Sequence, residues 1–282
     1  MVTQLPMYQV DAFASRVFSG NPAAIVVLEE SSQWLEDKVM QAIAAENNLS
    51  ETAFIKRREN DTYDIRWFTP TVEVDLCGHA TLASAHVIFS HLNHSSATVS
   101  FSCKSGALSV EKKGDVLALN FPTDILQPVA LADSENREVV EAIATGLSLT
   151  PLEIYRGRDD YLIIADNEYQ ITALKPDMAI VSTIPARGII VSAPGTAADF
   201  VSRFFAPQSG IPEDPVTGSA HTSLIPYWSK KLGKTTLKAQ QLSARGGELF
   251  CLDRGACSEY GGTKRVEIGG HAQTFMMGQI FV

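Results

Sequence analysis

The spacing of apolar residues predicts a chain made mostly of short strands. Apolar side chains alternate or run together over 7–10, 23–28, 52–56, 65–68, 98–102, 108–112 and 117–121, and again over 152–156, 161–165 and 188–192. Short runs bounded by glycine, proline and asparagine are typical of β-strands. Gly20-Asn21-Pro22 predicts a turn before the second strand.

Three segments have the character of helices. The first would have Ser32 as N-cap, apolar residues at 34, 35, 39 and 43, and a stop at Asn47-Asn48. The second, from about Gly78 to Ser90, is apolar on most faces, which is typical of a helix enclosed by a sheet. The third, Gly218 to Lys230, contains Pro226, which predicts a kink.

The two halves of the chain resemble each other. Arg66-Trp67-Phe68-Thr69-Pro70 is echoed 137 residues later by Arg203-Phe204-Phe205-Ala206-Pro207, and the same separation aligns Cys77 with Asp214. A three-residue insertion after that point aligns Gly78-His79-Ala80 with Gly218-Ser219-Ala220. These identities predict a duplicated unit.

The segment 122–129 has two prolines and no periodicity, and is the best candidate for a linker. We therefore expect an N-terminal domain over 1–122 and a C-terminal domain over 129–282. The last strand is a candidate to return to the first domain.

Composition excludes several classes of function. The 282 residues include 23 Lys+Arg and 32 Asp+Glu, a formal charge of −9, which disfavours binding to nucleic acid or anionic membranes. No apolar run is long enough to span a bilayer, and no signal peptide precedes Val10. Four cysteines do not make a disulfide scaffold, so we expect a cytoplasmic protein with reduced thiols, with Cys103, Cys251 and Cys257 as core residues.

No cofactor motif is visible. His86, His91 and His94 lie close in sequence but lack the accompanying ligands of a zinc site. Glycine-rich loops for nucleotides or flavins and a Schiff-base lysine context are also missing from the sequence. We therefore predict no metal and no cofactor.

The candidate chemistry lies where strands are predicted to lead into helices. Cys77-Gly78-His79 and Asp214-Pro215-Val216-Thr217-Gly218-Ser219 occupy equivalent junctions. A helix start offers unpaired N–H groups and partial positive charge, so two facing starts would hold a small carboxylate. The alternative is structural: Asp214 or Thr217 caps a helix, and Gly78 makes a turn.

The halves differ at one acid. Glu51 begins an apolar strand, whereas the repeat places Gly188 at that position in the second half. An enclosed acid can carry a proton in both directions, although most glutamates are surface residues. His79 is a candidate acid, base or hydrogen-bond donor, Ser219 a donor or cap, and Cys77 a nucleophile, a proton carrier or a small buried hydrophobe.

The chain resembles the PhzF family of phenazine-biosynthesis-like proteins, which share the diaminopimelate epimerase fold. The matching segments are Asp11-Ala12-Phe13, Phe18-Ser19-Gly20-Asn21-Pro22, Leu49-Ser50-Glu51-Thr52-Ala53-Phe54, Arg66-Trp67-Phe68-Thr69-Pro70, Asp75-Leu76-Cys77-Gly78-His79-Ala80-Thr81 and Glu213-Asp214-Pro215-Val216-Thr217-Gly218-Ser219-Ala220-His221. The resemblance implies an α+β fold of two pseudo-symmetric domains, each a curled mixed sheet around a central helix. It also implies an active site between the domains, no cofactor and a homodimer.

The resemblance also implies residue roles. In the family's namesake activity, isomerisation of trans-2,3-dihydro-3-hydroxyanthranilate, the glutamate at the position of Glu51 shuttles the proton. The positions of His79, Asp214 and Ser219 orient substrate and assist protonation at a second carbon. Epimerase relatives use a cysteine at each helix start; here Cys77 keeps the first position while Asp214 takes the second.

These observations predict a cofactor-independent isomerase of a small carboxylate. Glu51 would move the proton, and the amides at Gly78-His79 and Gly218-Ser219 would stabilise the developing charge. Two rivals stay open: a racemase or epimerase using Cys77 with Asp214, and a non-catalytic protein that binds a metabolite or another protein.

Overall fold

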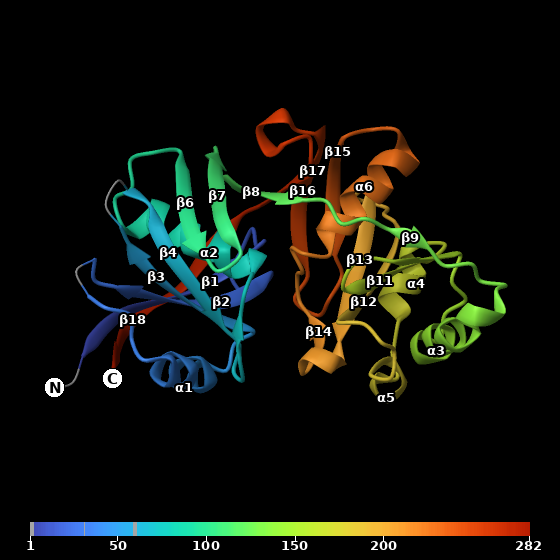
Figure 1. Cartoon of the computed structure of the whole chain (residues 1–282), viewed down its shortest axis with the longest axis horizontal. Coiled ribbons are helices and arrows are strands. Elements are labelled where there is room, and N and C mark those ends of the chain that lie inside the picture. The colour runs from blue at the N-terminus through green and yellow to red at the C-terminus, as the bar shows by residue number, and fades with distance from the viewer. Residues whose placement is uncertain (1–2, 31, 59–60) are drawn as a thin grey trace. The chain divides into compact units, whose positions relative to one another are not determined.

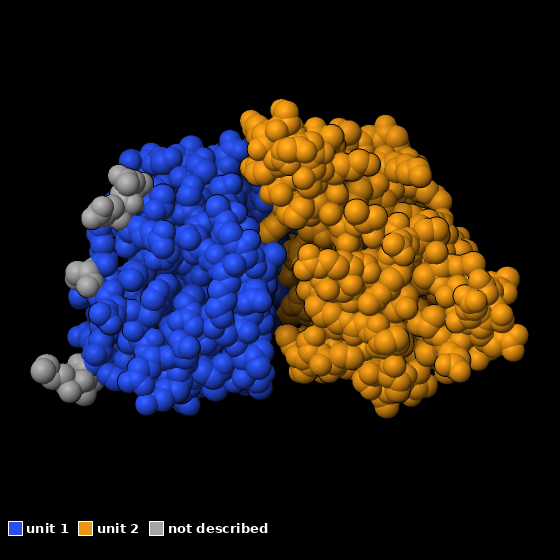
Figure 2. Space-filling view, viewed as in Figure 1, with its two compact units in different colours: residues 1–120, 268–282 blue, residues 121–267 orange. Residues whose placement is uncertain are grey.

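The chain divides into two compact units in a computed structural model that describes residues 3–30, 32–58 and 61–282. Unit 1 comprises Met1–Asn120 with Ile268–Val282, and unit 2 comprises Phe121–Glu267 (Figure 2). The final strand, which lies in the second of the predicted domains, belongs to unit 1 because it pairs with the first strand of the chain.

Unit 1 is a mixed sheet with one enclosed helix and one outer helix (Figure 1). Its elements are β1 (Gln4–Ala12), β2 (Asn21–Leu28), α1 (Asp37–Asn47), β3 (Glu51–Arg57), β4 (Tyr63–Phe68), β5 (Glu73–Val74), α2 (Gly78–His91), β6 (Thr98–Cys103), β7 (Gly106–Lys113), β8 (Val116–Pro122) and β18 (Ala272–Phe281).

Unit 2 repeats most of that order of strands and contains additional helical elements. It contains β9 (Gln127–Pro128), η2 (Ser134–Asn136), α3 (Arg137–Leu147), β10 (Glu153–Arg156), β11 (Asp160–Ile164), α4 (Glu168–Ala173), α5 (Met178–Val181), β12 (Gly188–Pro194), β13 (Phe200–Ala206), η3 (Pro207–Ser209), β14 (Ile211–Asp214), α6 (His221–Leu232), β15 (Thr236–Gln241), β16 (Gly247–Ala256), η4 (Ser258–Tyr260) and β17 (Lys264–Gly270). The unit boundaries at Asn120/Phe121 and Glu267/Ile268 fall within β8 and β17.

Strand pairing confirms that the two units have the same topology. In unit 1, β2 is parallel to β3, β3 antiparallel to β4, β4 antiparallel to β5, β4 parallel to β6, and β6 antiparallel to β7. In unit 2, β11, β12, β13, β14, β15 and β16 pair in the same sequence of senses. The predicted α+β class with two pseudo-symmetric mixed sheets is therefore confirmed.

Helix α2 is enclosed by strands, as its apolar faces predicted. It contacts β1, β2, β3, β7 and β18, and its residues from His79 to Ala85 are all buried. A helix surrounded in this way needs apolar or small side chains on every face. The position of its first turn is consequently fixed by packing on several sides.

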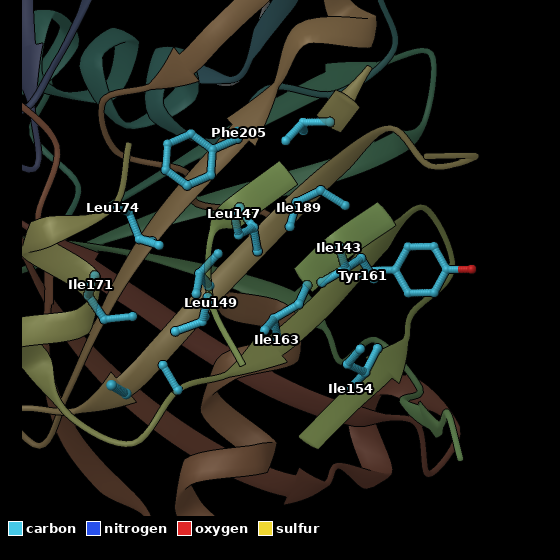
Figure 3. Packing of buried hydrophobic residues seen from close by; sticks show 14 of the residues in the cluster. Ile143, Leu147, Leu149, Ile154, Tyr161, Ile163, Ile171, Leu174, Ile189 and Phe205 are labelled. Carbon is cyan, nitrogen blue, oxygen red and sulfur yellow. The ribbon is translucent and has the colours of Figure 1, made fainter. Parts of the chain in front are cut away.

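The core of unit 2 packs helix α3 against the sheet (Figure 3). Ile143 and Leu147 from this helix meet Ile163 on β11 and Phe205 on β13 in one buried cluster. Helix α3 was not among the predicted helices, although its apolar residues recur at helical spacing: Val139, Val140, Ile143 and Leu147.

Two helix boundaries were predicted wrongly. Helix α1 begins at Asp37, so Trp34 and Leu35 precede it, and it ends as predicted with Asn48 in the left-handed conformation. Helix α6 begins at His221 instead of Gly218, because the preceding residues form tight turns in which His221 N–H donates to the Gly218 carbonyl. Pro226 lies inside α6.

Only one of the three cysteines interpreted as core is buried. Cys251 is buried, whereas Cys103 and Cys257 are half-buried at the edges of hairpins. In the described part of the chain, no helix combines the length and apolar character needed to cross a membrane.

Candidate active site

Glu51 and His79 form the centre of the candidate site in unit 1. Glu51 is the first residue of β3, and His79 lies in the first turn of α2, which packs against that strand. His79 Nε2 lies 3.1 Å from Glu51 Oε2, and the two side chains are only 6% and 14% exposed. Within the described residues neither of these two atoms has a hydrogen bond of good geometry. The contact is therefore an ion pair, and both buried atoms still lack a hydrogen-bond partner.

Cys77 and Asn21 lie on the other side of the imidazole. Cys77 Sγ is 3.5 Å from His79 Nδ1, and Asn21 Nδ2 is 3.3 Å from the same nitrogen. The two ring nitrogens therefore face different partners. The result is a buried chain from Cys77 through His79 to Glu51.

Burial and charge set the protonation of this chain. Burial by itself lowers the pKa of His79, but the adjoining Cys77 and Glu51 more than offset it and raise that pKa well above 6.5. Burial, followed by the negative charge of Glu51, raises the pKa of the Cys77 thiol. Cys77 and Glu51 thus favour the charged form of His79, while burial and the Glu51 charge favour the neutral form of the Cys77 thiol.

Glu51, Cys77 and His79 are also potential metal ligands. Among residues 3–30, 32–58 and 61–282 they form the one group of His, Cys and carboxylate side chains whose ligand atoms are close enough to bind a single ion. Their ligand atoms lie within 4.8 Å of one another. However, Cys77 contacts Nδ1 of His79 and Glu51 contacts Nε2. The imidazole ring therefore lies between the two side chains, and no single ring nitrogen faces both of them. This arrangement suits proton transfer better than shared coordination.

The start of α2 offers backbone donors next to this chain. Cys77 is the N-cap in extended conformation, and within the described structure no side chain caps the helix there. The amides of Gly78 and His79 are thus available to an anion, with the positive end of the helix behind them. Thr81 donates its hydroxyl to the Cys77 carbonyl at 2.5 Å and holds the turn in place.

In unit 2 the corresponding connection is held by a glutamine. Gln241 Oε1 accepts from Thr217 N–H at 2.8 Å, and Gln241 Nε2 donates to the Asp214 carbonyl at 2.7 Å. The Thr217 hydroxyl donates to Asp214 Oδ2 at 2.6 Å, and His221 Nδ1 lies 2.8 Å from the Thr217 carbonyl. These bonds fix the Asp214 carboxylate at the end of β14.

Ser219 in unit 2 is bonded to an arginine. Arg187 Nη2 donates to Ser219 Oγ at 3.1 Å. The same guanidinium donates through Nε to Asp160 Oδ1 at 2.9 Å and through Nη2 to Asp160 Oδ2. Burial works against the charge of Arg187, but the Asp160 carboxylate outweighs it and raises the arginine's pKa.

The alignment of Cys77 with Asp214 is wrong. Arg66 on β4 binds Glu73 on β5 through two nitrogens, and Arg203 on β13 binds Glu213 on β14 in the same way, which makes Glu73 and Glu213 equivalent. Trp67 pairs with Val74 and Phe204 with Asp214. The three-residue insertion therefore lies in the loop before β14, Asp214 corresponds to Val74, and Thr217 corresponds to Cys77.

The predicted residues thus fall into two groups. Glu51, Cys77, Gly78 and His79 come together in unit 1, while Asp214, Gly218 and Ser219 share one connection in unit 2. Arg187 and Gln241 were not predicted to belong to the site, Asn21 was predicted only as part of a turn, and Thr217 only as a possible helix cap. Asn21 and Thr217 stand inside motifs already quoted, whereas nothing in the local sequence marks Gln241.

The three clustered histidines serve other purposes. His86 and His91 both contact Thr274 Oγ1 at 2.9 Å, and His94 Nδ1 lies 3.5 Å from Asp61 Oδ2. Burial lowers the pKa of His86 to about 4. His86 and His91 thus share Thr274, whereas His94 has a different partner, Asp61.

Comparison with protein families gives one match over nearly the whole chain. The family described as phenazine biosynthesis-like protein, PhzC-PhzF, matches residues 10–278. The chain is 48% identical over 277 residues to an uncharacterized isomerase of Pseudomonas aeruginosa, covering 98% of each protein. It is 39% identical over 267 residues to a human phenazine biosynthesis-like domain-containing protein, covering 87% of this chain and 91% of the human protein.

Solved structures give the same result. A PhzF-family protein of Enterococcus faecalis superposes with a TM-score of 0.90 and 43% identity, covering 99% of this chain and 100% of that one. A hydroxyproline epimerase of Agrobacterium vitis shares the fold alone, with a TM-score of 0.62, 7% identity, and coverage of 99% of this chain and 93% of that one. The predicted epimerase-like fold is confirmed.

Proposed function

We propose that this chain, which belongs to the PhzC-PhzF family of phenazine biosynthesis-like proteins, is an isomerase that moves a proton on a small carboxylate substrate without a cofactor. The family match and the relatives named isomerases support the class of enzyme. The observation that carries the mechanism is the buried pair of Glu51 and His79 beside the open start of α2.

Glu51 is the proton carrier in this proposal. Its carboxylate is enclosed, and its Oε2 lies 3.1 Å from His79 Nε2 without an aligned hydrogen bond in the described residues. An enclosed carboxylate of this kind suits proton exchange with a substrate C–H. The carbon must be acidified by an adjacent double bond or carboxyl group. Protonated Glu51 then returns the proton to a second carbon, which shifts the double bond.

His79 and the helix start stabilise the charge that develops. The raised pKa of His79 keeps its imidazolium charged, so it holds Glu51 in place and offsets negative charge near it. The amides of Gly78 and His79 donate to the substrate anion.

A racemase that uses Cys77 and Asp214 as opposed proton carriers has less support. Asp214 does not occupy the position equivalent to Cys77, and burial raises the pKa of the Cys77 thiol, which disfavours the thiolate that such chemistry requires.

The test is deuterium uptake from heavy water. The purified protein is incubated with a metabolite extract and with a set of small cyclic and amino-acid carboxylates, and mass spectrometry identifies any acid that gains deuterium. We expect at least one acid to exchange, and Glu51→Gln to slow that exchange by about 100-fold or more, the usual contribution of a positioned acid–base group.

Glu111→Gln is the matched control, because Glu111 is an exposed acid on β7 of the same unit. Exchange at the wild-type rate in Glu51→Gln would overturn the shuttle. Binding of an acid without any deuterium uptake by the wild-type protein would favour the non-catalytic alternative.

A further inference from the structure

Unit 1 contains a cavity that is separate from the chain of Cys77, His79 and Glu51. It has a volume of about 420 Å³, and the described residues that line it all belong to unit 1. Its walls come from the loop after β1, the last two turns of α2, the hairpin of β7 and β8, and the segment that leads into β18. The candidate active site lies at the first turn of α2, so the cavity is a second place where a ligand could bind.

A lysine occupies a core-facing position at the edge of this cavity. Along β7, Val110 is buried and Glu111 is exposed, and the alternation of a strand places Lys112 on the same face as Val110. Lys112 is opposite the buried Leu117 on β8, and its ammonium lies 5.7 Å from the centre of the Phe89 ring on α2. The inner face of the hairpin therefore ends in a cation.

This lysine has neither of the usual structural roles. Inward-pointing charges commonly protect the edge strands of sheets, but β7 pairs with β6 on one side and with β8 on the other. Lys113 pairs with Glu111 at 3.4 Å, whereas no carboxylate in the described part of the chain lies within ion-pair distance of the Lys112 ammonium. The charge of Lys112 is therefore available to a ligand.

The other polar groups of the cavity complement this cation. Asp115 lies in the turn between β7 and β8, and its carboxylate has no ion-pair partner among the described residues. His271 Nδ1 lies 3.0 Å from the Asp115 carbonyl oxygen and ties this turn to the segment before β18. His86 contacts Thr274 Oγ1 through Nε2, and burial lowers its pKa to about 4, so this ring adds a neutral hydrogen-bonding group.

We propose that this cavity binds a free amino acid, with the Lys112 ammonium on its carboxylate and the Asp115 carboxylate on its ammonium group. Two unpaired charges of opposite sign, three residues apart, match the two ends of a zwitterion, and each contact is a charge-assisted hydrogen bond. The apolar surfaces of Phe89 and Leu117 receive the ligand's side chain. The volume lies within the range of about 300–1,000 Å³ that is usual for small-molecule sites.

The experiment measures binding of the common L-amino acids to the full-length protein by isothermal titration calorimetry. Each amino acid that binds is compared with two analogues that lack one charge each: its carboxamide, and the acid in which hydrogen replaces the amino group. We expect at least one amino acid to bind, and each of its analogues to bind about tenfold or more weakly.

Variants assign each charge to its partner. Lys112→Met keeps the apolar stem and should weaken binding of the amino acid about tenfold or more, while binding of its carboxamide stays the same. Asp115→Asn should weaken the amino acid in the same way and leave the acid without the amino group unaffected. Lys113→Met is the matched control, because Lys113 is the next residue on β7 and lies on its opposite face. All three positions are exposed, so each variant should keep the wild-type Tm.

Three results would overturn the proposal: no L-amino acid bound by the wild-type protein, full affinity in Lys112→Met, or an equal loss of affinity in Lys113→Met. Glu51→Gln distinguishes this cavity from the candidate active site and should bind the amino acid as tightly as the wild type. A loss in Glu51→Gln together with full affinity in Lys112→Met would place the amino acid at Glu51 and refute this site. Deuterium uptake is measured separately, so either outcome leaves the proposed isomerase to its own test.

Discussion

The two units share one topology but place different charged side chains beside the connection that leads into their second long helix. In unit 1, the first residue after the helix connection is an acid, Glu51, and it faces an imidazolium at the start of α2. In unit 2, the equivalent residue is Gly188, and its neighbour Arg187 faces a serine hydroxyl. Ser219 is the counterpart of His79, so the same position contacts a carboxylate, Glu51, in unit 1 and a guanidinium, Arg187, in unit 2.

This comparison shows which parts of the duplication are structural. The arginine–glutamate pairs Arg66–Glu73 and Arg203–Glu213 are kept in both units with nearly the same bond lengths. Bidentate pairs of this kind fix two adjacent strands in register. The positions beside the helix starts differ, as expected if the scaffold was kept while each unit specialised.

The largest effect on stability is expected at Gly188, the counterpart of Glu51 in unit 2. Gly188→Ala should lower the free energy of unfolding by about 2 kcal/mol, because the new Cβ collides with the buried Phe204 ring. Urea unfolding measures this loss. Phe204→Leu in the same chain should recover part of it, with Phe204→Leu alone as the control.

A Gly188→Ala protein as stable as the wild type would show that the ring moves aside freely. In that case Gly188 would not be needed to place the Phe204 ring.

An intermediate effect on stability is expected from a change of pH. The contribution of His79 in unit 1 is lost as the pH rises, and that of His221 in unit 2 is lost as the pH falls. His79 has a raised pKa, so its contribution to stability is complete below 6.5 and is lost as the pH rises through the folded-state value. Burial lowers the pKa of His221 to about 4, so its contribution is present above 6.5 and is lost as the pH falls from 6.5 towards 4.

Urea unfolding at a series of pH values separates the two contributions. His79→Gln should flatten the alkaline side of the stability profile, and His221→Gln the acidic side. If either variant flattened the opposite side, the assigned protonation states would be incorrect.

The smallest effect is expected at the thiol. Cys77→Ser should keep deuterium exchange within about threefold of the wild-type rate, because the neutral Cys77 thiol is not a proton carrier in the proposed mechanism. The rate of deuterium uptake by the acid found in the heavy-water screen measures this. A loss of about 100-fold would instead support the racemase that uses Cys77.

Much of the scaffold could be predicted from the sequence because its signals are local. Apolar runs located β2, β3 and β12, and the apolar faces of 78–90 indicated an enclosed helix. The separation of 137 residues correctly predicted that Glu51 and Gly188 begin equivalent strands. Helix α3 was missed although its spacing was readable.

The sequence by itself determined the duplicated topology and the difference between an acid and a glycine at one position, because residue type and spacing record both. Only the tertiary structure decided that Thr217, and not Asp214, corresponds to Cys77, since an insertion can be placed only when strand pairing is known. It alone also brought Arg187 to Ser219 and Gln241 to Thr217. Such contacts join residues more than 20 positions apart, and they depend on strand register and side-chain direction, which no local pattern encodes.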